Sequence, residues 1–377
     1  MWLNPNRPMK RYHYSYLRNV YLVEESVLGD LLEGFRAGAT EQARDLGMCD
    51  PNGAGSLTHP SLDRVLYADG KVVTPLYKAK PGTNRVDHVT GEILGEKRSD
   101  PDAQLHITGS GEMAWGNKFV LVNARLPEPH ARVILDVSSV PDKGGEAAVA
   151  LDALRCVSPL LPGAQGVLYD GAFRWVHNQV VLAELGLLPI VPVTAKSGGK
   201  RLRQPREERV VRIGPCVVKT PDGTETVQLY SRMGAVGLGE LDEAGEVVFR
   251  RLERVAVKRH LNRTGGHRFY VEYRLPADKG SGIVRVRLDK TTQDAATKFN
   301  RPEHLRGIPT DDPDWDRLYP RRSDAESINR ALDDTLWLRR AHSKGRHRQL
   351  FELMGFALMT NALAVYRHSN SALSRAG

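Results

Sequence analysis

Cysteine is scarce in this sequence and is not placed to bind metal or to build a disulfide framework. Three cysteines, Cys49, Cys156 and Cys216, are spread along 377 residues, and no two of them form a C-x-x-C pair. A structural zinc site and a disulfide-stabilised secreted fold are therefore not expected. We expect the protein to work in a reducing compartment, the cytoplasm.

Long apolar runs are also missing. The N-terminal residues MWLNPNRPMKRYHYSY carry positive charge, but no apolar stretch of the signal-peptide kind follows them. The most apolar segment, residues 350–365, is interrupted by Glu352, Thr360 and Asn361. It is also shorter than the run of roughly 20 apolar residues that crosses a bilayer. We interpret this segment as a buried helix and expect no membrane association.

Acidic residues are outnumbered by basic ones. Lys and Arg total 54, whereas Asp and Glu total 45, which gives a formal net charge of +9 at pH 7. This balance favours a polyanionic partner such as DNA or RNA, because each phosphate that a cation neutralises releases condensed counterions. Charge alone leaves the partner open, since many basic proteins bind no nucleic acid. The apolar residues, 41% of the chain, suffice for a sizeable folded core.

What the sequence does contain is a regular succession of apolar segments. Their spacings predict, in chain order, a helix over 20–47, strands over 64–70, 118–126 and 131–139, a helix over 145–158, a strand over 165–171, a helix over 175–186 and a strand over 188–196. From the first strand onward the order is β-β-β-α-β-α-β, which an RNase H-like fold requires. We therefore predict an α/β fold with an RNase H-like mixed sheet flanked by helices.

The second half of the chain changes character. Between about residues 200 and 295, alternating apolar and polar residues are separated by Gly-rich turns, which predicts an antiparallel β-rich insertion. The rest of the chain reads as helical. We expect four parts: an N-terminal helical segment (1–60), the first part of the core (61–199), the β-rich insertion (200–310) and the C-terminal helices of the core (311–377).

Two predicted strands end in nearly the same way, with V-L-Y-A-D-G at 65–70 and V-L-Y-D-G at 167–171. An apolar strand that delivers a carboxylate at its exposed end, followed by Gly, gives a metal ligand a rigid support with space beside it. Asp69 and Asp170 are therefore candidate ligands. Asp-Gly is also a common turn dipeptide, so a plain turn is the alternative for each. A rival for the first ligand, Asp136, fits worse because only one helix separates it from Asp170.

The third candidate carboxylate is Glu326, in the helix predicted after the β-rich insertion. Ser323 and Glu326 have the S-x-x-E spacing of a helix capping box, and Arg330 lies four residues further on. Capping and an ordinary ion pair are thus alternatives to metal binding. The 155 residues between Asp170 and Glu326 are too many for a bare RNase H-like core, but they fit once the insertion is included.

Taken together, these segments resemble the bacterial insertion-sequence DDE transposases. GVLYDGAF, followed by a helix and LPIVPVTAK, is similar to the region of their second Asp. Tyr319, Arg322 and Glu326 have the spacing Y-x2-R-x3-E of the transposases that carry a β-rich insertion. In that signature a Lys follows seven residues after the Glu, whereas this sequence has Asp333. The basic turn and apolar helix near the C-terminus resemble the tail of the family.

The resemblance implies metal-dependent cleavage and joining of double-stranded DNA. Asp69, Asp170 and Glu326 would bind two Mg²⁺ or Mn²⁺ ions, which are hard cations that prefer oxygen ligands. DNA would be nicked at a transposon end, and the freed 3′-hydroxyl would be joined to target DNA. A homodimer is expected because transposition brings two ends together. The protein would be a bacterial cytoplasmic protein, associated with the nucleoid when bound to DNA.

Basic and aromatic side chains are expected to contact the DNA backbone and so to position it without reading its sequence. These candidates are Tyr319, Arg322, Lys196, Arg339, Arg340, Lys344, Arg346 and Arg348. Two alternatives stay open. The chain is an inactive or truncated remnant that only binds DNA, as Asp333 and the short predicted N-terminal part would suggest, or it is an RNase H-like metal-dependent nuclease that cuts without joining.

Overall fold

The structure is a computed structural model of the chain. It describes residues 10–21, 24–107, 113–128, 131–141, 145–193, 209–220, 223–241, 243, 245, 247–297 and 299–376. Apolar side chains from these segments form one large core around a central sheet and a second core in the β-rich part.

The central sheet is mixed, and its strands follow the order β6-β5-β1-β7-β8. Its strands are β1 (Val65–Val73), β5 (Met113–Arg125), β6 (Arg132–Ser139), β7 (Gly166–Leu168) and β8 (Leu188–Ile190), with β4 (Gln104–Ile107) paired to the first part of β5. Strand β5 runs antiparallel to both β1 and β6, whereas β1, β7 and β8 are parallel to one another. The predicted succession of strands and helices in this part is confirmed. Strand β4 was not predicted, because its residues do not alternate clearly.

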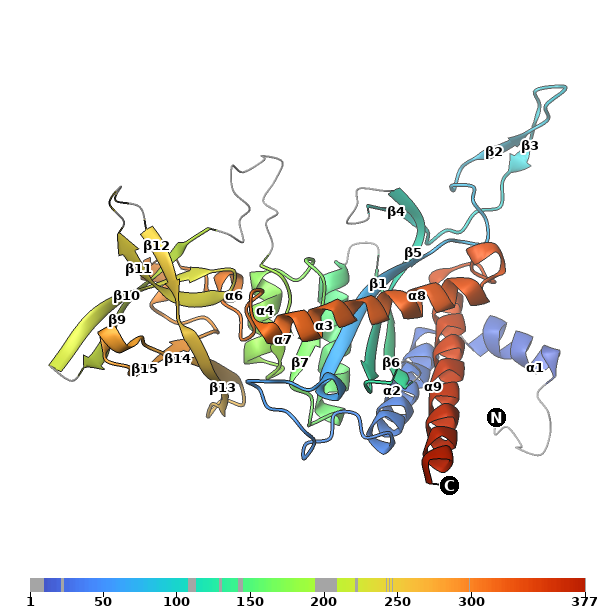
Figure 1. Ribbon diagram of the computed structural model, residues 1–377. Helices are drawn as coiled ribbons and strands as arrows, with labels where there is room; N and C mark the ends of the chain where they lie inside the picture. Colours follow the sequence, from blue (N-terminus) through green and yellow to red (C-terminus); the bar gives the residue numbers. More distant parts are fainter. Residues whose placement is uncertain are drawn as a thin grey trace.

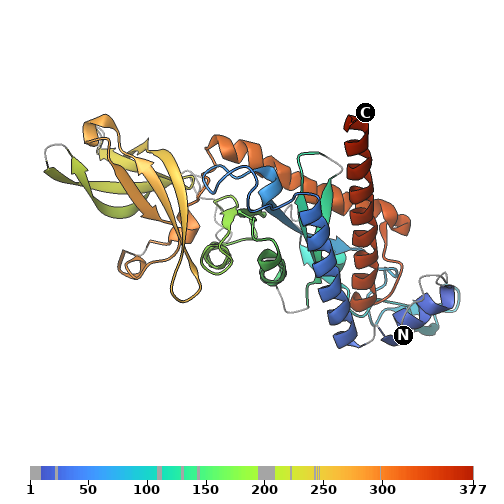
Figure 2. The same cartoon turned by 90° about the horizontal axis from the view of Figure 1, so that it is seen from below.

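Helices surround this sheet (Figures 1 and 2). They are α2 (Glu25–Asp45), α3 (Glu146–Val157), α4 (Trp175–Ala183), α8 (Ser323–Thr335) and α9 (Arg346–Ala376). Helices α2 and α9 lie side by side and both pack against β6. Leu350, Leu353 and Ala357 of α9 are buried, as expected for the apolar segment near the C-terminus. Among the described residues, no helix is both long and apolar enough to cross a membrane.

The β-rich part lies at one end of the molecule (Figure 1). One antiparallel sheet contains β9 (Val211–Thr220), β10 (Gly223–Arg232), β11 (Ala235–Leu241) and β12 (Val247–Arg251), and a second contains β13 (Glu253–Leu261), β14 (His267–Arg274) and β15 (Ile283–Arg287). Phe269, Val271 and Tyr273 fill the core between these strands. Short helices α5 (Asp294–Thr297), α6 (Arg301–His304) and α7 (Pro313–Leu318) then lead the chain back to α8.

A short helix and a hairpin lie outside the central sheet with its helices and outside the β-rich part. Helix α1 (Arg11–Tyr16) is near the N-terminus, and a two-stranded hairpin of β2 (Asn84–Val86) and β3 (Ile93–Glu96) projects from the end of the molecule opposite the β-rich part (Figure 1). The hairpin lies between the strands predicted over 64–70 and 118–126, where no helix or strand was predicted.

Candidate active site

Asp69 lies on β1, and Asp170 follows the end of the neighbouring parallel strand β7. The parallel pairing of β1 and β7 aligns Tyr67 with Leu168, and each carboxylate follows two residues later. Strand β7 ends at Leu168, and the Asp170 Oδ1 atom then accepts a hydrogen bond of 2.7 Å from the Ala172 N–H. The structure therefore brings together the first two carboxylates that the sequence singled out.

The prediction that Asp69 ends its strand is wrong. Strand β1 continues to Val73, because the long strand β5 offers it partners as far as the pair Val73 and Asn117. The sequence obscured this continuation, since Gly70 and Lys71 interrupt the apolar run. Asp69 is consequently held within a strand that is paired through its own position, which fixes its backbone more firmly than a strand end would.

Negative charge is concentrated around these two carboxylates. Burial raises the pKa of Asp69 to about 7, with Glu146 and Asp170 acting in the same direction and Arg322 opposing them. Burial also raises the pKa of Asp170, again with Glu146 adding to the effect, whereas Arg322 and Lys118 oppose it. The nearby basic groups thus offset the negative charge of these carboxylates only in part. A bound cation would favour the ionised forms of the carboxylates.

Glu146 is a member of this cluster that sequence reasoning missed. It is the first residue of α3, and its carboxylate accepts a hydrogen bond of 2.7 Å from the Tyr169 hydroxyl and forms an ion pair with Lys118. Only the pattern Gly145-Glu146 before an apolar helix was visible in the sequence. That pattern is typical of an acidic residue in a first helical turn, so it gave no signal of a site.

Helix α8 reaches the site through Asn329. The Asn329 Nδ2 atom donates a hydrogen bond of 2.8 Å to Asp69 Oδ2. Glu326 lies three residues earlier, so it faces the same side of the helix. Its side chain is 53% exposed and accepts a hydrogen bond of 2.5 Å from Arg322. The structure therefore brings the helix of Glu326 to Asp69 but leaves its carboxylate bound to Arg322.

Of the two alternatives considered for Glu326, capping is absent and an ion pair is present with a different partner. The Ser323 hydroxyl donates to the Pro320 carbonyl at 2.8 Å, and no capping box is found at the start of α8. The ion-pair partner of Glu326 is Arg322, which precedes it by four residues, rather than Arg330. The capping role is thus absent, whereas an ordinary ion pair four residues apart is present with a different partner.

Tyr319 lies close to the same carboxylates. Its ring stacks on Trp315, with ring centroids 4.2 Å apart and an interplanar angle of 13°. Burial raises the pKa of the Tyr319 hydroxyl, Arg322 opposes this, and Asp170 and Glu326 add to it. Tyr319 and Arg322 are thus both within electrostatic reach of Asp170, as the Y-x2-R-x3-E spacing led us to expect for a single site.

Asp333 occupies the position at which the resembled signature has Lys. Its Oδ2 atom forms an ion pair of 2.5 Å with the ammonium of Lys71 on β1. Positive charge is therefore present at this point of α8, but it comes from the strand and is already paired. A free lysine for DNA phosphate is not supplied by this residue pair.

The chemistry of these carboxylates suits a divalent ion, but their present arrangement does not form a complete metal site. Oxygen donors suit Mg²⁺ and Mn²⁺, and burial, with the neighbouring acids, raises the pKa of Asp69 and of Asp170. Within the described ranges, no group of three or more His, Cys, Asp or Glu side chains is arranged to hold a metal ion. Glu326 would have to leave Arg322 to complete the expected set of three.

Asp136, the rival first ligand, has a different role. Its side chain is fully buried, and it forms an ion pair with Arg36 of α2. The Ser138 hydroxyl donates to Asp136 Oδ2 at 2.6 Å. A paired, inaccessible carboxylate that joins α2 to β6 is a structural residue, so Asp69 is the better candidate for the first position.

The predicted DNA-contacting residues of the tail lie beyond the far end of β1. Thr74 forms a β-bridge with Arg340, and Asp69 lies five residues before it, roughly 17 Å along an extended strand. Arg339 and Lys344 are exposed, whereas Arg340, Arg346 and Arg348 are half-buried. Lys196 falls in 194–208, outside the described residues.

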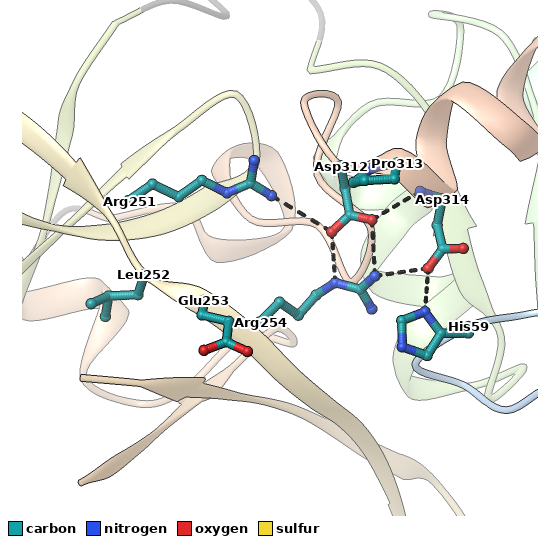
Figure 3. A pocket seen from close by; sticks show the side chains of 8 residues that line it. All are labelled: His59, Arg251, Leu252, Glu253, Arg254, Asp312, Pro313 and Asp314. Atoms are coloured by element: carbon teal, nitrogen blue, oxygen red, sulfur yellow. Dashed lines mark hydrogen bonds and ion pairs between the residues drawn. The ribbon is translucent and has the colours of Figure 1, made fainter. Parts of the chain in front are cut away.

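An ion-pair network ties the β-rich part to the chain that enters α8 (Figure 3). Arg254 of β13, almost fully buried, contacts Asp312 through two hydrogen bonds of 2.9 and 3.0 Å and Asp314 through one of 2.9 Å. His59 approaches Asp314 from the loop before β1, at 2.6 Å. This network surrounds a pocket at the junction, and its partners satisfy one another, so we interpret it as structural.

The carboxylates Asp69, Asp170 and Glu146, together with Asn329 and Arg322 of the α8 segment, make up the candidate site. Its residues come from β1, from α3, from the loop after β7 and from the segment that leads into and forms α8. In comparisons with known proteins, the sequence matches no protein-family model and no curated protein.

Proposed function

We propose that this protein cleaves double-stranded DNA and joins the freed 3′-hydroxyl to target DNA, in the manner of a DDE transposase. Asp69, Asp170 and Glu326 would hold two divalent metal ions. The observation that carries the proposal is the parallel register of β1 and β7, which brings Asp69 and Asp170 level at an edge of the sheet where α8 also makes contact.

The architecture supports this proposal. The strand order β6-β5-β1-β7-β8, with β5 antiparallel to its neighbours, is compatible with an RNase H-like core. The β-rich strands precede α8, as the insertion of the resembled transposases precedes the helix of their Glu.

The side chains of the site have separable tasks in this proposal. When bound, the metal ions would activate water or a 3′-hydroxyl and stabilise the leaving oxygen of an in-line displacement. Asn329 holds the Asp69 carboxylate in one orientation through its 2.8 Å hydrogen bond. Tyr319 and Arg322 are within electrostatic reach of Asp170, where a scissile phosphate would lie, and Arg322 would exchange Glu326 for a phosphate oxygen.

Cleavage of supercoiled plasmid in Mg²⁺ or Mn²⁺ tests the proposal directly. The plasmid should carry the gene with its flanking DNA, and the products should be examined both for nicks and for joining of a labelled 3′ end to target DNA. We expect both products, and we expect EDTA to abolish them. Nicking without joining would favour a nuclease, and binding without either product would favour an inactive remnant.

One alternative is favoured by a specific observation. Glu326 is exposed and its carboxylate is paired with Arg322, which is the arrangement expected of a remnant that binds DNA without cutting it. An active enzyme and a DNA-binding remnant would differ in the behaviour of this ion pair. In an active enzyme the pair must open when DNA arrives, whereas in a remnant it would persist.

Replacing Arg322 with Ala tests whether this pair opens. We expect Mn²⁺ to bind the free Arg322→Ala protein severalfold more tightly than the wild type, because Glu326 is released and a cation is removed from the site. DNA binding should weaken, and the slope of log affinity against log salt should fall by about 1, as for the loss of one phosphate contact. Mn²⁺ electron paramagnetic resonance and fluorescence anisotropy measure the two effects.

Arg330→Ala is the matched control, because Arg330 is exposed on the same helix and forms no ion pair within the described chain. It should leave Mn²⁺ affinity unchanged. Equal Mn²⁺ affinity and an equal salt slope in Arg322→Ala and the wild type would show that Arg322 neither restrains Glu326 nor contacts phosphate.

A further inference from the structure

Helix α9 is apolar on two opposite sides, and only one of them is buried. Its inner side packs against β6 and includes the buried residues Leu353, Ala357 and Ala364. Its outer side carries a second set of apolar residues three and four positions apart, which places them on one helix face. All six are exposed, and we call them the outer stripe: Gly355, Leu358, Met359, Ala362, Leu363 and Tyr366.

The outer stripe differs from an ordinary exposed helix face because charge is missing. Residues 353–366 include no Asp, Glu, Lys, Arg or His, although half of this segment faces outward. The exposed fractions of Leu358, Met359, Leu363 and Tyr366 are 54%, 49%, 43% and 65%. A helix that is apolar all round is normally buried, and a contiguous exposed apolar patch marks a surface that binds a partner.

Side-chain sizes make the outer stripe complementary to itself. Two copies of α9, packed antiparallel about a two-fold axis level with residues 360 and 361, would bring each stripe residue opposite another stripe residue of the partner subunit. The pairs are Tyr366 with Gly355, Met359 with Ala362 and Leu358 with Leu363. The largest side chain thus meets the residue that has none. A Cβ added at Gly355 would contact nothing within 4 Å, so the space over it is open to the ring.

Charges at the two ends of the outer stripe fit the same arrangement. Glu352 precedes the stripe, where its carboxylate accepts a hydrogen bond of 3.2 Å from the His342 N–H, and the exposed Arg367 follows it. In an antiparallel pair both lie on the same flank of the interface. Glu352 would then be offset from Arg367 of the partner subunit by roughly 3 Å along the helix axis. Parallel packing would instead bring like charges together, so the antiparallel arrangement is favoured.

We propose that two copies of this chain associate through the outer stripe, as an antiparallel pair of α9 helices. This inference goes beyond the proposed function, because it concerns the protein alone and needs neither DNA nor metal. Four half-exposed side chains would bury roughly 400 Å² on each copy, which is less than the roughly 600–1,000 Å² per partner of stable interfaces. The dimer is therefore weak, with a Kd on the order of 10 µM, and two copies bound to one DNA would form it more readily.

Sedimentation velocity over a series of protein concentrations, without DNA, tests the proposal. We expect Leu358→Glu and Leu363→Lys each to weaken dimerisation at least about tenfold, because the two-fold axis places each new charge in the apolar interface twice. Melting temperatures should stay unchanged, since both side chains are exposed in the monomer. Leu261→Glu, at a leucine of β13 that is 71% exposed, is the matched control and should dimerise as the wild type does.

Combining Leu358→Glu with Leu363→Lys in one chain should restore association. Each introduced carboxylate would then meet an introduced ammonium of the partner subunit, which happens only in the antiparallel pairing. A wild type that stays monomeric up to about 100 µM, tenfold above the expected Kd, would overturn the proposal. So would dimers that persist in both single variants, or a double variant that stays monomeric. Cleavage is not measured, so failure of the proposed function would not change these results.

Discussion

Replacing Asp170 with Asn is expected to abolish DNA cleavage and leave DNA binding intact. Asn keeps an oxygen that can accept the Ala172 N–H at 2.7 Å, so the loop after β7 should hold its shape. It removes the negative charge that a divalent ion requires. Since metal ions supply several kcal/mol of transition-state stabilisation, we expect the rate of plasmid nicking to fall roughly 10³-fold.

The same variant should not be less stable than the wild type. Asp170 is partly buried beside Asp69 and Glu146, and the loss of one charge relieves their repulsion. Asp152→Asn is the control, because Asp152 is exposed on α3 and paired with Arg155. Anisotropy with a labelled duplex checks DNA binding. Cleavage by Asp170→Asn within tenfold of the wild type would contradict the assignment of this carboxylate.

Replacing Arg306 with Met is expected to destabilise the whole protein strongly. Arg306 is fully buried, and burial lowers its pKa to about 10. No ion pair is found for it among the described residues; its guanidinium instead donates to the carbonyls of Val191, Pro192, Pro302, Glu303 and Leu305, at 2.8–3.2 Å. It therefore joins the end of β8 to the segment that follows the β-rich part.

Met preserves much of the side-chain volume but leaves these carbonyls without their charged donor. Each buried acceptor left unsatisfied costs about 1–3 kcal/mol, and part of this is offset because the guanidinium no longer has to be desolvated. We expect the free energy of unfolding to fall by about 3 kcal/mol in urea titrations. Arg268→Met, at an exposed site on β14, should change it by less than about 0.5 kcal/mol. Equal stability of the two variants would refute this role of Arg306.

The sequence by itself determined the elements of the core and two of the acids. Apolar spacing predicted β1, β5, β6 and β7 because buried strands must be apolar and are short. The repeated V-L-Y shortly before Asp69 and Asp170 predicted that each of these carboxylates follows a buried strand. The alternating segments after residue 200 likewise predicted antiparallel strands, since alternation records one buried and one exposed face.

Other features could not be predicted, because they depend on which segments meet in space. The extent of β1 past Asp69 was decided by the length of β5, and the charge of Asp333 is explained by Lys71, a residue 262 positions away along the chain. The sequence made Asp136 the weaker candidate for the first ligand, but only the structure shows that Arg36 is its partner. Each of these outcomes is a pairing between distant residues, which local pattern does not encode.

The same distinction between sequence and tertiary structure applies to the candidate site. The sequence determined that Asp69 and Asp170 follow apolar strands, and that Glu326 lies in a helix near Tyr319 and Arg322. Only the tertiary structure decided that Glu146 sits over Gly70 and that Glu326 is turned toward Arg322. The physical reason is that a carboxylate takes its role from the charges and donors around it, and these are brought to it by the packing of the sheet and helices.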